Sequence, residues 1–333
     1  MENLLRTLCA AEGVAGHEAA AAETASCLLE KYCENVRIDA LGSVVGQRPG
    51  KGNRLLLDAH LDQIGMVVTA IEDGGFLRVA PCGGMDIRVL AGQAVTIHGK
   101  RALYGVIPAT PPHLSKGEDK TPEWTDILID TGLPRDEIEA IAPAGTRVSL
   151  RTPPARLLGQ RFTAPALDDR AGVAVLLRCL ELLGDKETCP LTIIFSAQEE
   201  TGHGGAKAAG FAAGADRAIA VDVSFAQAPG LSPQDAQGEL GGGVMIGVAA
   251  SLDEKMSDAL YRLAKENNIP HSIEVMGGRT GTNVDALHTV RAGLPCALLS
   301  IPLRNMHTAA EVVDLRDIEA AAQLMAAYIL NEK

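Results

Sequence analysis

The sequence predicts an α/β fold in which helices flank a sheet and a small all-β domain is inserted. Helical spacings of apolar residues alternate with short β-branched runs, which is typical of an α/β sheet. From about Met66 to Phe162 the alternation stops, and β-type runs follow one another between Gly and Pro. The 333 residues also exceed the ~250 to 300 at which one core usually stops growing. The larger domain should therefore comprise residues 1–65 and 163–333, and the inserted domain residues 66–162.

The elements before the insertion lead from helix into the sheet. Residues 2–33 are rich in Ala, Leu and Glu at helical spacing, interrupted near "GVAGHE". One short strand is expected near "ENVRIDALGSVVG", and "RLLLDAH" has the composition of a strand buried on both faces. Inside the insertion, "ATPPHLSKGEDKTPEW" is predicted to be a mobile loop because of its Pro, Gly and charged residues.

Helix and strand patterns resume after the insertion. The stretch "DDRAGVAVLLRCLELLG" predicts a helix, and "LTIIFSA" predicts a buried strand. Two further amphipathic helices are expected at "DEKMSDALYRLAKENN" and "LRDIEAAAQLMAAYIL".

The composition argues against nucleic acid and membrane as partners. The formal charge is -12 and no long basic run occurs, whereas phosphate backbones and anionic lipids need clustered Lys and Arg. Aromatic residues make up only 3%, which disfavours a stacking platform for bases. No apolar run reaches the ~18 residues of a membrane span.

The cysteines and the N-terminus predict a cytoplasmic protein. Seven cysteines, odd in number and without a CxxC pair, suit reduced thiols. The start "MENLLRTLCAAEG" lacks the basic residues and the cleavage site of a secretory signal.

Five short stretches place metal-competent side chains at the edge of an apolar strand or at a helix start. Taken singly, each has a plain explanation, because such a His is usually a core residue, such an Asp an N-cap, and a Glu pair a solvated turn. The side chains are His60 and Asp62, Asp168 and Asp169, Glu199 and Glu200, Asp222, and His307.

Together these residues fit two divalent ions bound by nitrogen and oxygen. Suppose that Asp168 bridges the ions, that His60 and Asp222 complete one site, and that Glu200 and His307 complete the other. Three carboxylates against two dications leave one positive charge, which a bridging hydroxide would cancel. Without metal, the clustered carboxylates would repel one another and raise their pKa values.

Two pairs suggest a division of roles. His60 and Asp62 are two apart, so on a strand they point the same way, and Asp62 could fix the tautomer of His60. The adjacent Glu199 and Glu200 must point differently. Glu200 would then bind a metal, and Glu199 would take a proton from the metal-bound water.

The set and order of the motifs resemble the M42 family of dinuclear metalloaminopeptidases, which includes the tetrahedral and glutamyl aminopeptidases. The motifs are "AHLDQIG", "ALDDRAG", "SAQEETG", "VDVS" and "PLRNMHTAAEVVDLRDIEAA". The resemblance covers essentially the whole chain, inserted domain included. It implies a metallopeptidase-type sheet, dimers built through the inserted domain and, in many relatives, twelve-subunit shells.

Residue by residue, the family pattern makes Glu199 the general base and Asp62 the partner that orients His60. It also implies a cis peptide between Asp168 and Asp169. The implied metal ligands, with Asp168 bridging, are His60, Asp168, Glu200, Asp222 and His307. The native metal stays open, since Zn, Co and Mn all accept His and carboxylate ligands.

The chain departs from the family pattern after the Glu-Glu-x-Gly turn. There it has His203 and Gly204 where family members commonly have an aliphatic residue and Arg, which concerns the subunit contacts or the pocket and not the ligands. We expect His203 to be a polar, solvated loop residue and not a ligand. Residues 277–288 ("GGRTGTNVDALH") resemble a family stretch near the substrate pocket, and their glycines suit a plain turn equally well.

The sequence thus predicts a metal-dependent aminopeptidase that hydrolyses N-terminal residues from short peptides through a hydroxide bridging two divalent ions. One alternative is a dinuclear metal-dependent amidase or deacylase of small N-acyl compounds. Another is a non-catalytic assembly subunit, which the intact ligand set argues against. The expected partners are short peptides and further copies of the chain, in a dimer or a dodecamer.

Overall fold

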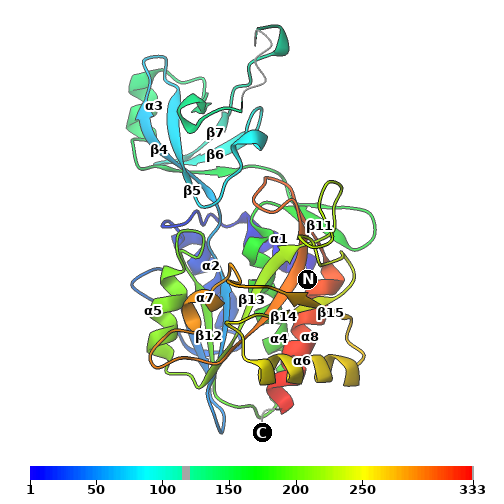
Figure 1. Cartoon of the computed structure of the whole chain (residues 1–333). Coiled ribbons are helices and arrows are strands. Elements are labelled where there is room, and N and C mark those ends of the chain that lie inside the picture. Colours follow the sequence, from blue (N-terminus) through cyan, green and yellow to red (C-terminus); the bar gives the residue numbers. More distant parts are fainter. Residues whose placement is uncertain (115–120, 332–333) are drawn as a thin grey trace.

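The computed structural model describes residues 1–114 and 121–331, and its strands form two sheets (Figure 1). Among these residues, eleven strands form a large sheet with helices on both faces, and six form a smaller sheet. The smaller sheet stands above the large one in Figure 1. The predicted fold class, an α/β sheet flanked by helices with an inserted β unit, is confirmed.

The elements are numbered along the chain. The helices are α1 (Glu2–Ala10), α2 (Ala19–Leu29), α3 (Arg135–Ile141), α4 (Leu167–Leu183), α5 (Gly204–Ala213), α6 (Glu254–Glu266), α7 (Val284–Leu287) and α8 (Leu315–Asn331). The strands of the large sheet are β1 (Glu34–Ile38), β2 (Val44–Arg48), β3 (Leu55–His60), β10 (Ala155–Arg156), β11 (Arg161–Ala164), β12 (Leu191–Ser196), β13 (Arg217–Phe225), β14 (Val244–Val248), β15 (His271–Val275), β16 (Cys296–Arg304) and β17 (Glu311–Asp314). Those of the small sheet are β4 (Gly65–Ile71), β5 (Leu77–Cys82), β6 (Ala94–His98), β7 (Ala102–Val106), β8 (Leu128–Ile129) and β9 (Arg147–Leu150).

The centre of the large sheet is apolar on both faces because helices cover both. The strands β12, β3, β13 and β16 are parallel neighbours. Side chains alternate along β3: Leu55 and Leu57 pack in the same cluster as residues of α4 and α8, and Leu56 packs with residues of α5 and α7. The four strands therefore end at the same edge of the sheet.

The small sheet closes on itself. Its strands run in the order β7-β6-β9-β4-β5-β8, and Val106 at one edge exchanges backbone hydrogen bonds with Asp130, which follows β8 at the other. The predicted all-β unit also contains the helix α3, which begins after Pro134. The acidic residues in its first turn interact favourably with the helix dipole, and Ile138 is fully buried. The sequence did not predict this helix because seven residues are too few to show a helical period.

The N-terminal loop ties the two sheets together. Val14 pairs with Gln63, just before β4. Glu12 Oε2 lies 2.9 Å from His98 Nδ1, and His98 Nε2 lies 2.8 Å from Ser149 Oγ. The small sheet is thus held by polar contacts as well as by the covalent chain.

The loops and helices outside the sheets agree with the sequence only in part. The interrupted N-terminal helix is confirmed by α1 and α2. The prediction of a single strand near residues 34–46 is wrong, because two antiparallel strands, β1 and β2, occupy this segment. In the turn between them, Asp39 accepts from two backbone N–H groups, and Gly42 has a φ of 96°. Residues 115–120 of the predicted mobile loop lie outside the described residues. Within the described chain, none of the helices has the length and apolar character needed to span a membrane.

Candidate metal centre

The predicted site residues gather at the carboxyl edge of the parallel strands. Open α/β sheets place their chemistry at this edge, where polar side chains can follow buried strands. His60 ends β3, Asp222 lies in β13, Glu199 and Glu200 follow β12, His307 follows β16, and Asp168 lies in the first turn of α4.

Asp168 is the centre of the cluster. Its Oδ1 lies 2.9 Å from His60 Nε2, and its Oδ2 lies 3.2 Å from His307 Nε2. His307 Nε2 is also 3.3 Å from Glu200 Oε1, and His60 Nε2 is 3.8 Å from Asp222 Oδ1. The two oxygens of Asp168 therefore face two different histidines.

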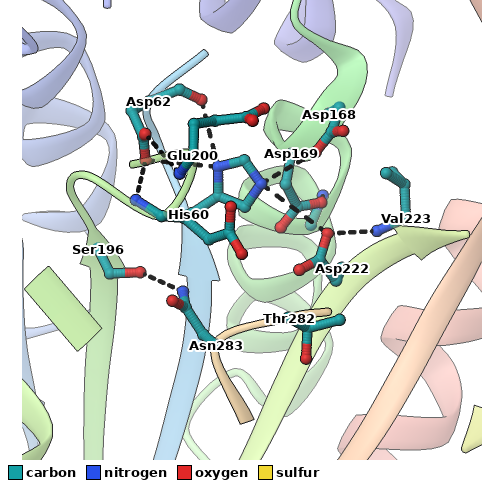
Figure 2. A network of polar contacts seen from close by, with 12 residues as sticks. His60, Asp62, Asp168, Asp169, Ser196, Glu200, Asp222, Val223, Thr282 and Asn283 are labelled. Carbon is teal, nitrogen blue, oxygen red and sulfur yellow. Dashed lines mark hydrogen bonds and ion pairs between the residues drawn. The ribbon is translucent and has the colours of Figure 1, made fainter. Parts of the chain in front are cut away.

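The donor set fits a divalent cation. Two groups of described side chains each have ligand atoms within 4.8 Å of one another, namely His60, Asp168 and Glu200, and His60, Asp169 and Asp222 (Figure 2). Imidazole nitrogen and carboxylate oxygen are ligands that Zn, Co and Mn accept. The second group includes Asp169, which the predicted ligand set omitted.

Burial and mutual charge shift the pKa values of the cluster. Burial disfavours the charged forms of His60 and His307, but Asp168 and the other carboxylates outweigh it, so the pKa of His60 lies well above its usual range and that of His307 rises to about 11. Burial raises the pKa of Asp222 well above its usual range. Burial opposes ionisation of Asp168, but the two histidines prevail and lower its pKa. A cation that binds here competes with the protons of the histidines.

Two buried carboxylates hold the backbone of the site. Asp62 accepts from the backbone N–H groups of Glu199 at 2.9 Å and Glu200 at 3.1 Å, and its Oδ1 lies 3.5 Å from His60 Nδ1. Glu311 accepts from two further backbone N–H groups of the site. Each carboxylate fixes turns that carry site residues.

Glu311 is a site residue that the sequence analysis missed. It is 2% exposed and accepts from the backbone N–H groups of Asp168 at 3.1 Å and His307 at 2.9 Å. Its position four residues after His307, inside an apolar run, is the only signal that the sequence offers.

The small sheet contributes a backbone group to the site. His307 Nδ1 lies 2.8 Å from the carbonyl oxygen of Gly84, which follows β5. This contact suits an Nδ1–H donor and turns Nε2 toward Asp168. A Cβ at Gly84 would lie 3.0 Å from His307 Nδ1, so a larger residue there would crowd the ring.

The first turn of α4 is irregular where it meets the site. The peptide bond between Asp168 and Asp169 is cis, as the resemblance implies, and both residues have non-helical backbone angles. Asp169 Oδ1 accepts from the backbone N–H of Gly172 at 2.8 Å. A Cβ at Gly172 would lie 2.2 Å from Asp169 Oδ2, so only glycine leaves room for this carboxylate.

The cluster opens into a cavity of about 440 Å³. Thr280, Gly281 and Thr282 line it, so residues 277–288 contribute to the pocket and are not only a turn. Its lining residues are His60, Gly84, Asp168, Glu199, Glu200, Gly202, His203, Asp222, Val223, Ser224, Phe225, Thr280, Gly281, Thr282, Met306 and His307.

His203 is not the solvated residue that we expected. Its side chain is 27% exposed, and Nδ1 lies 2.9 Å from Glu199 Oε1, because a left-handed backbone turn folds the ring back over the glutamate. It belongs to neither group of potential metal ligands in the described chain.

Comparison with known proteins places the chain among peptidases. The family model of the M42 glutamyl aminopeptidases matches residues 42–324. The lysyl aminopeptidase of Pyrococcus furiosus is 32% identical over 335 residues, which cover 98% of this chain and 96% of that protein.

Solved structures are similar over nearly the whole chain. An aminopeptidase from the archaeon Desulfurococcus kamchatkensis has a TM-score of 0.93 and 32% identity, covering 98% of this chain and 94% of that one. The TET1 peptidase of Pyrococcus horikoshii, described as able to assemble into a tetrahedron or a large octahedral shell, has a TM-score of 0.87 and 29% identity and covers 98% of each chain.

Binding of a divalent ion is expected to release protons. The pKa of His307, raised to about 11, means that this ring holds a proton near neutral pH, and the pKa of His60 is shifted in the same direction, whereas ligation requires the neutral ring. Affinity should therefore fall as the pH falls. Calorimetric titration with zinc, cobalt or manganese in buffers of different ionisation enthalpy measures the released protons. His17→Asn, outside the cavity, is the control, and binding heats independent of the buffer would contradict the expectation.

Proposed function

Because the chain belongs to the M42 glutamyl aminopeptidase family and is a peptide-hydrolysing enzyme, we propose that it removes N-terminal residues from short peptides at the cluster around Asp168. The observation that carries the proposal is the arrangement of Asp168, with one oxygen toward His60 and the other toward His307. Such an arrangement suits a carboxylate shared between two cations.

Two divalent ions would be held on either side of Asp168. His60 and Asp222 would complete one site, and Glu200 and His307 the other. Asp169 lies close enough to His60 and Asp222 to support the first. Divalent ions at such a site polarise the carbonyl of the scissile bond and lower the pKa of the attacking water.

Glu199 would act as the general base. It lines the cavity beside Asp168, and its side chain is 11% exposed. The hydrogen bond from the Glu199 backbone N–H to Asp62 fixes its position just after the end of β12. From there it takes a proton from the attacking water and returns one to the leaving amine.

The cavity favours a peptide with a free N-terminus. Among its described lining residues none is Lys or Arg, and Glu199, the lining carboxylate outside the proposed ligand set, brings a negative charge when it serves as the base. A protonated α-amine complements this charge, and an N-acyl group does not. This observation favours the aminopeptidase over the deacylase of N-acyl compounds.

The chain would self-associate through residues 66–162, first as a dimer and then as a dodecamer. The likeness to a shell-forming peptidase supports this. So do exposed apolar side chains in this region: Tyr104 is 55% exposed, Leu114 64% and Leu158 96%. The cytoplasmic location is likewise a proposal, resting on the cysteine pattern.

Substitution of the two glutamates should separate their roles. Glu199→Gln is expected to keep both ions and lose turnover by roughly 10² to 10⁴, because an amide of nearly the same shape cannot accept the proton. Glu200→Ala should instead deplete one ion and regain activity at high metal concentration. Metal content measured beside the rate tests both, and near-normal turnover of Glu199→Gln would refute its role as the base.

A blocked N-terminus should abolish cleavage. We expect aminoacyl chromogenic substrates to be hydrolysed after incubation with zinc, cobalt or manganese, and their N-acetylated counterparts to react poorly, because acetylation removes the positive charge. Activity should vanish on prolonged chelation and return with the ion. Efficient hydrolysis of the acetylated series would favour the amidase instead.

Charge placed on the proposed interface should break the assembly. Light scattering of the wild type with metal is expected to give at least a dimer. Leu158→Asp should lower the mass, since burial of an unpaired carboxylate at an interface is unfavourable. Leu231→Asp is the matched control, because Leu231 is 49% exposed and lies outside residues 66–162. A monomeric wild type would overturn the proposal.

A further inference from the structure

His203 begins α5 in an unusual backbone conformation. Its φ and ψ are 60° and 27°, the left-handed region, which few residues other than Gly and Asn adopt readily. The backbone N–H groups of Gly202 and His203 both donate to the carbonyl of Glu199, at 2.9 Å and 3.1 Å. This tight turn brings the imidazole back over the Glu199 side chain.

The imidazole and the Glu199 carboxylate are in contact. Nδ1 lies 2.9 Å from Oε1, and both residues line the cavity that holds Asp168. The ring is within ion-pair distance but is not aligned for an ideal hydrogen bond, as is common for catalytic contacts before substrate binds. The contact to Glu199, and then that to Asn283, raises the pKa of His203 despite partial burial.

Asn283 is a buried neighbour that influences the His203 ring. It is 2% exposed, and its Nδ2 donates to Asp58 Oδ2 at 2.7 Å. The same Nδ2 donates to Ser196 Oγ at 2.7 Å (Figure 2). These two bonds fix the orientation of the amide. Its Oδ1 is buried and has no aligned hydrogen-bond partner among the described residues, so its acceptor is available to the His203 ring.

We propose that His203 is a positioning residue for Glu199: Nδ1–H holds Oε1 and leaves Oε2 to accept the proton of the attacking water. The inference rests on the proposed role of Glu199 as the base. It does not depend on the charge of the ring, because the neutral Nδ1–H tautomer and the protonated ring both donate at this atom. Without the contact, the carboxylate would sample other rotamers.

Three substitutions separate the donor from the backbone conformation. In His203→Asn the donor nitrogen is bonded to Cγ, just as Nδ1 is in histidine. Asn also tolerates the left-handed region. His203→Leu keeps a similar branch without a donor. His203→Gly lacks the donor and adopts the same backbone without strain, so it replaces the Leu variant should that variant fold poorly.

We expect His203→Leu and His203→Gly to lower kcat by about 10- to 100-fold with KM and metal content unchanged, since misplacement of a base affects the transition state. His203→Asn should stay within about threefold of the wild type. In a Glu199→Gln background, His203→Leu should have almost no further effect, because the two residues act as a unit. A fully additive loss, a normal kcat in the Leu and Gly variants, or an Asn variant as slow as Leu would overturn the inference.

Crystal structures supply a readout that does not depend on activity. The Glu199 carboxylate should keep its place in the wild type and in His203→Asn, and leave it in His203→Leu. A carboxylate that stays in place in His203→Leu would overturn the inference. If Glu199→Gln kept normal turnover while the carboxylate moved as expected, the proposed base would be wrong and the positioning contact would still stand.

Discussion

The carboxylate of Asp62 accepts hydrogen bonds from the backbone N–H groups of both Glu199 and Glu200, and the rest of the site depends on this contact. It joins the end of β3 to the turn after β12 and also flanks His60. Glu311 makes the same kind of contact with two other site residues, because it accepts from the backbone N–H groups of Asp168 and His307. The site residues are thus positioned through their backbone, which is stiffer than a side chain.

The strands that carry the site could be predicted because strands buried on both faces give uninterrupted apolar runs, as at "RLLLDAH" and "LTIIFSA". The candidate ligands stood out because they follow such runs directly. Glu311 and Asn283 could not be predicted. Glu311 contacts Asp168 across 143 positions, and Asn283 contacts Asp58 across 225, so only the folded sheet brings them together.

His203 shows where local patterns mislead. A histidine among glycines after a strand resembles a solvated loop, and the sequence contains no sign of the left-handed turn that reverses its direction. The buried and hydrogen-bonded Asp58, Ser196 and Asn283 come from three separate segments.

The carbonyl of Gly84 joins the small sheet to His307, and this has a consequence for energetic coupling. If contacts between subunits order the segment after β5, part of that free energy appears as tighter binding of the ion that we propose for His307. Linkage is reciprocal, so the bound ion must strengthen the subunit contacts by the same amount. Metal supply and self-association would then report on the same equilibrium, and a shortage of metal would favour the smaller species.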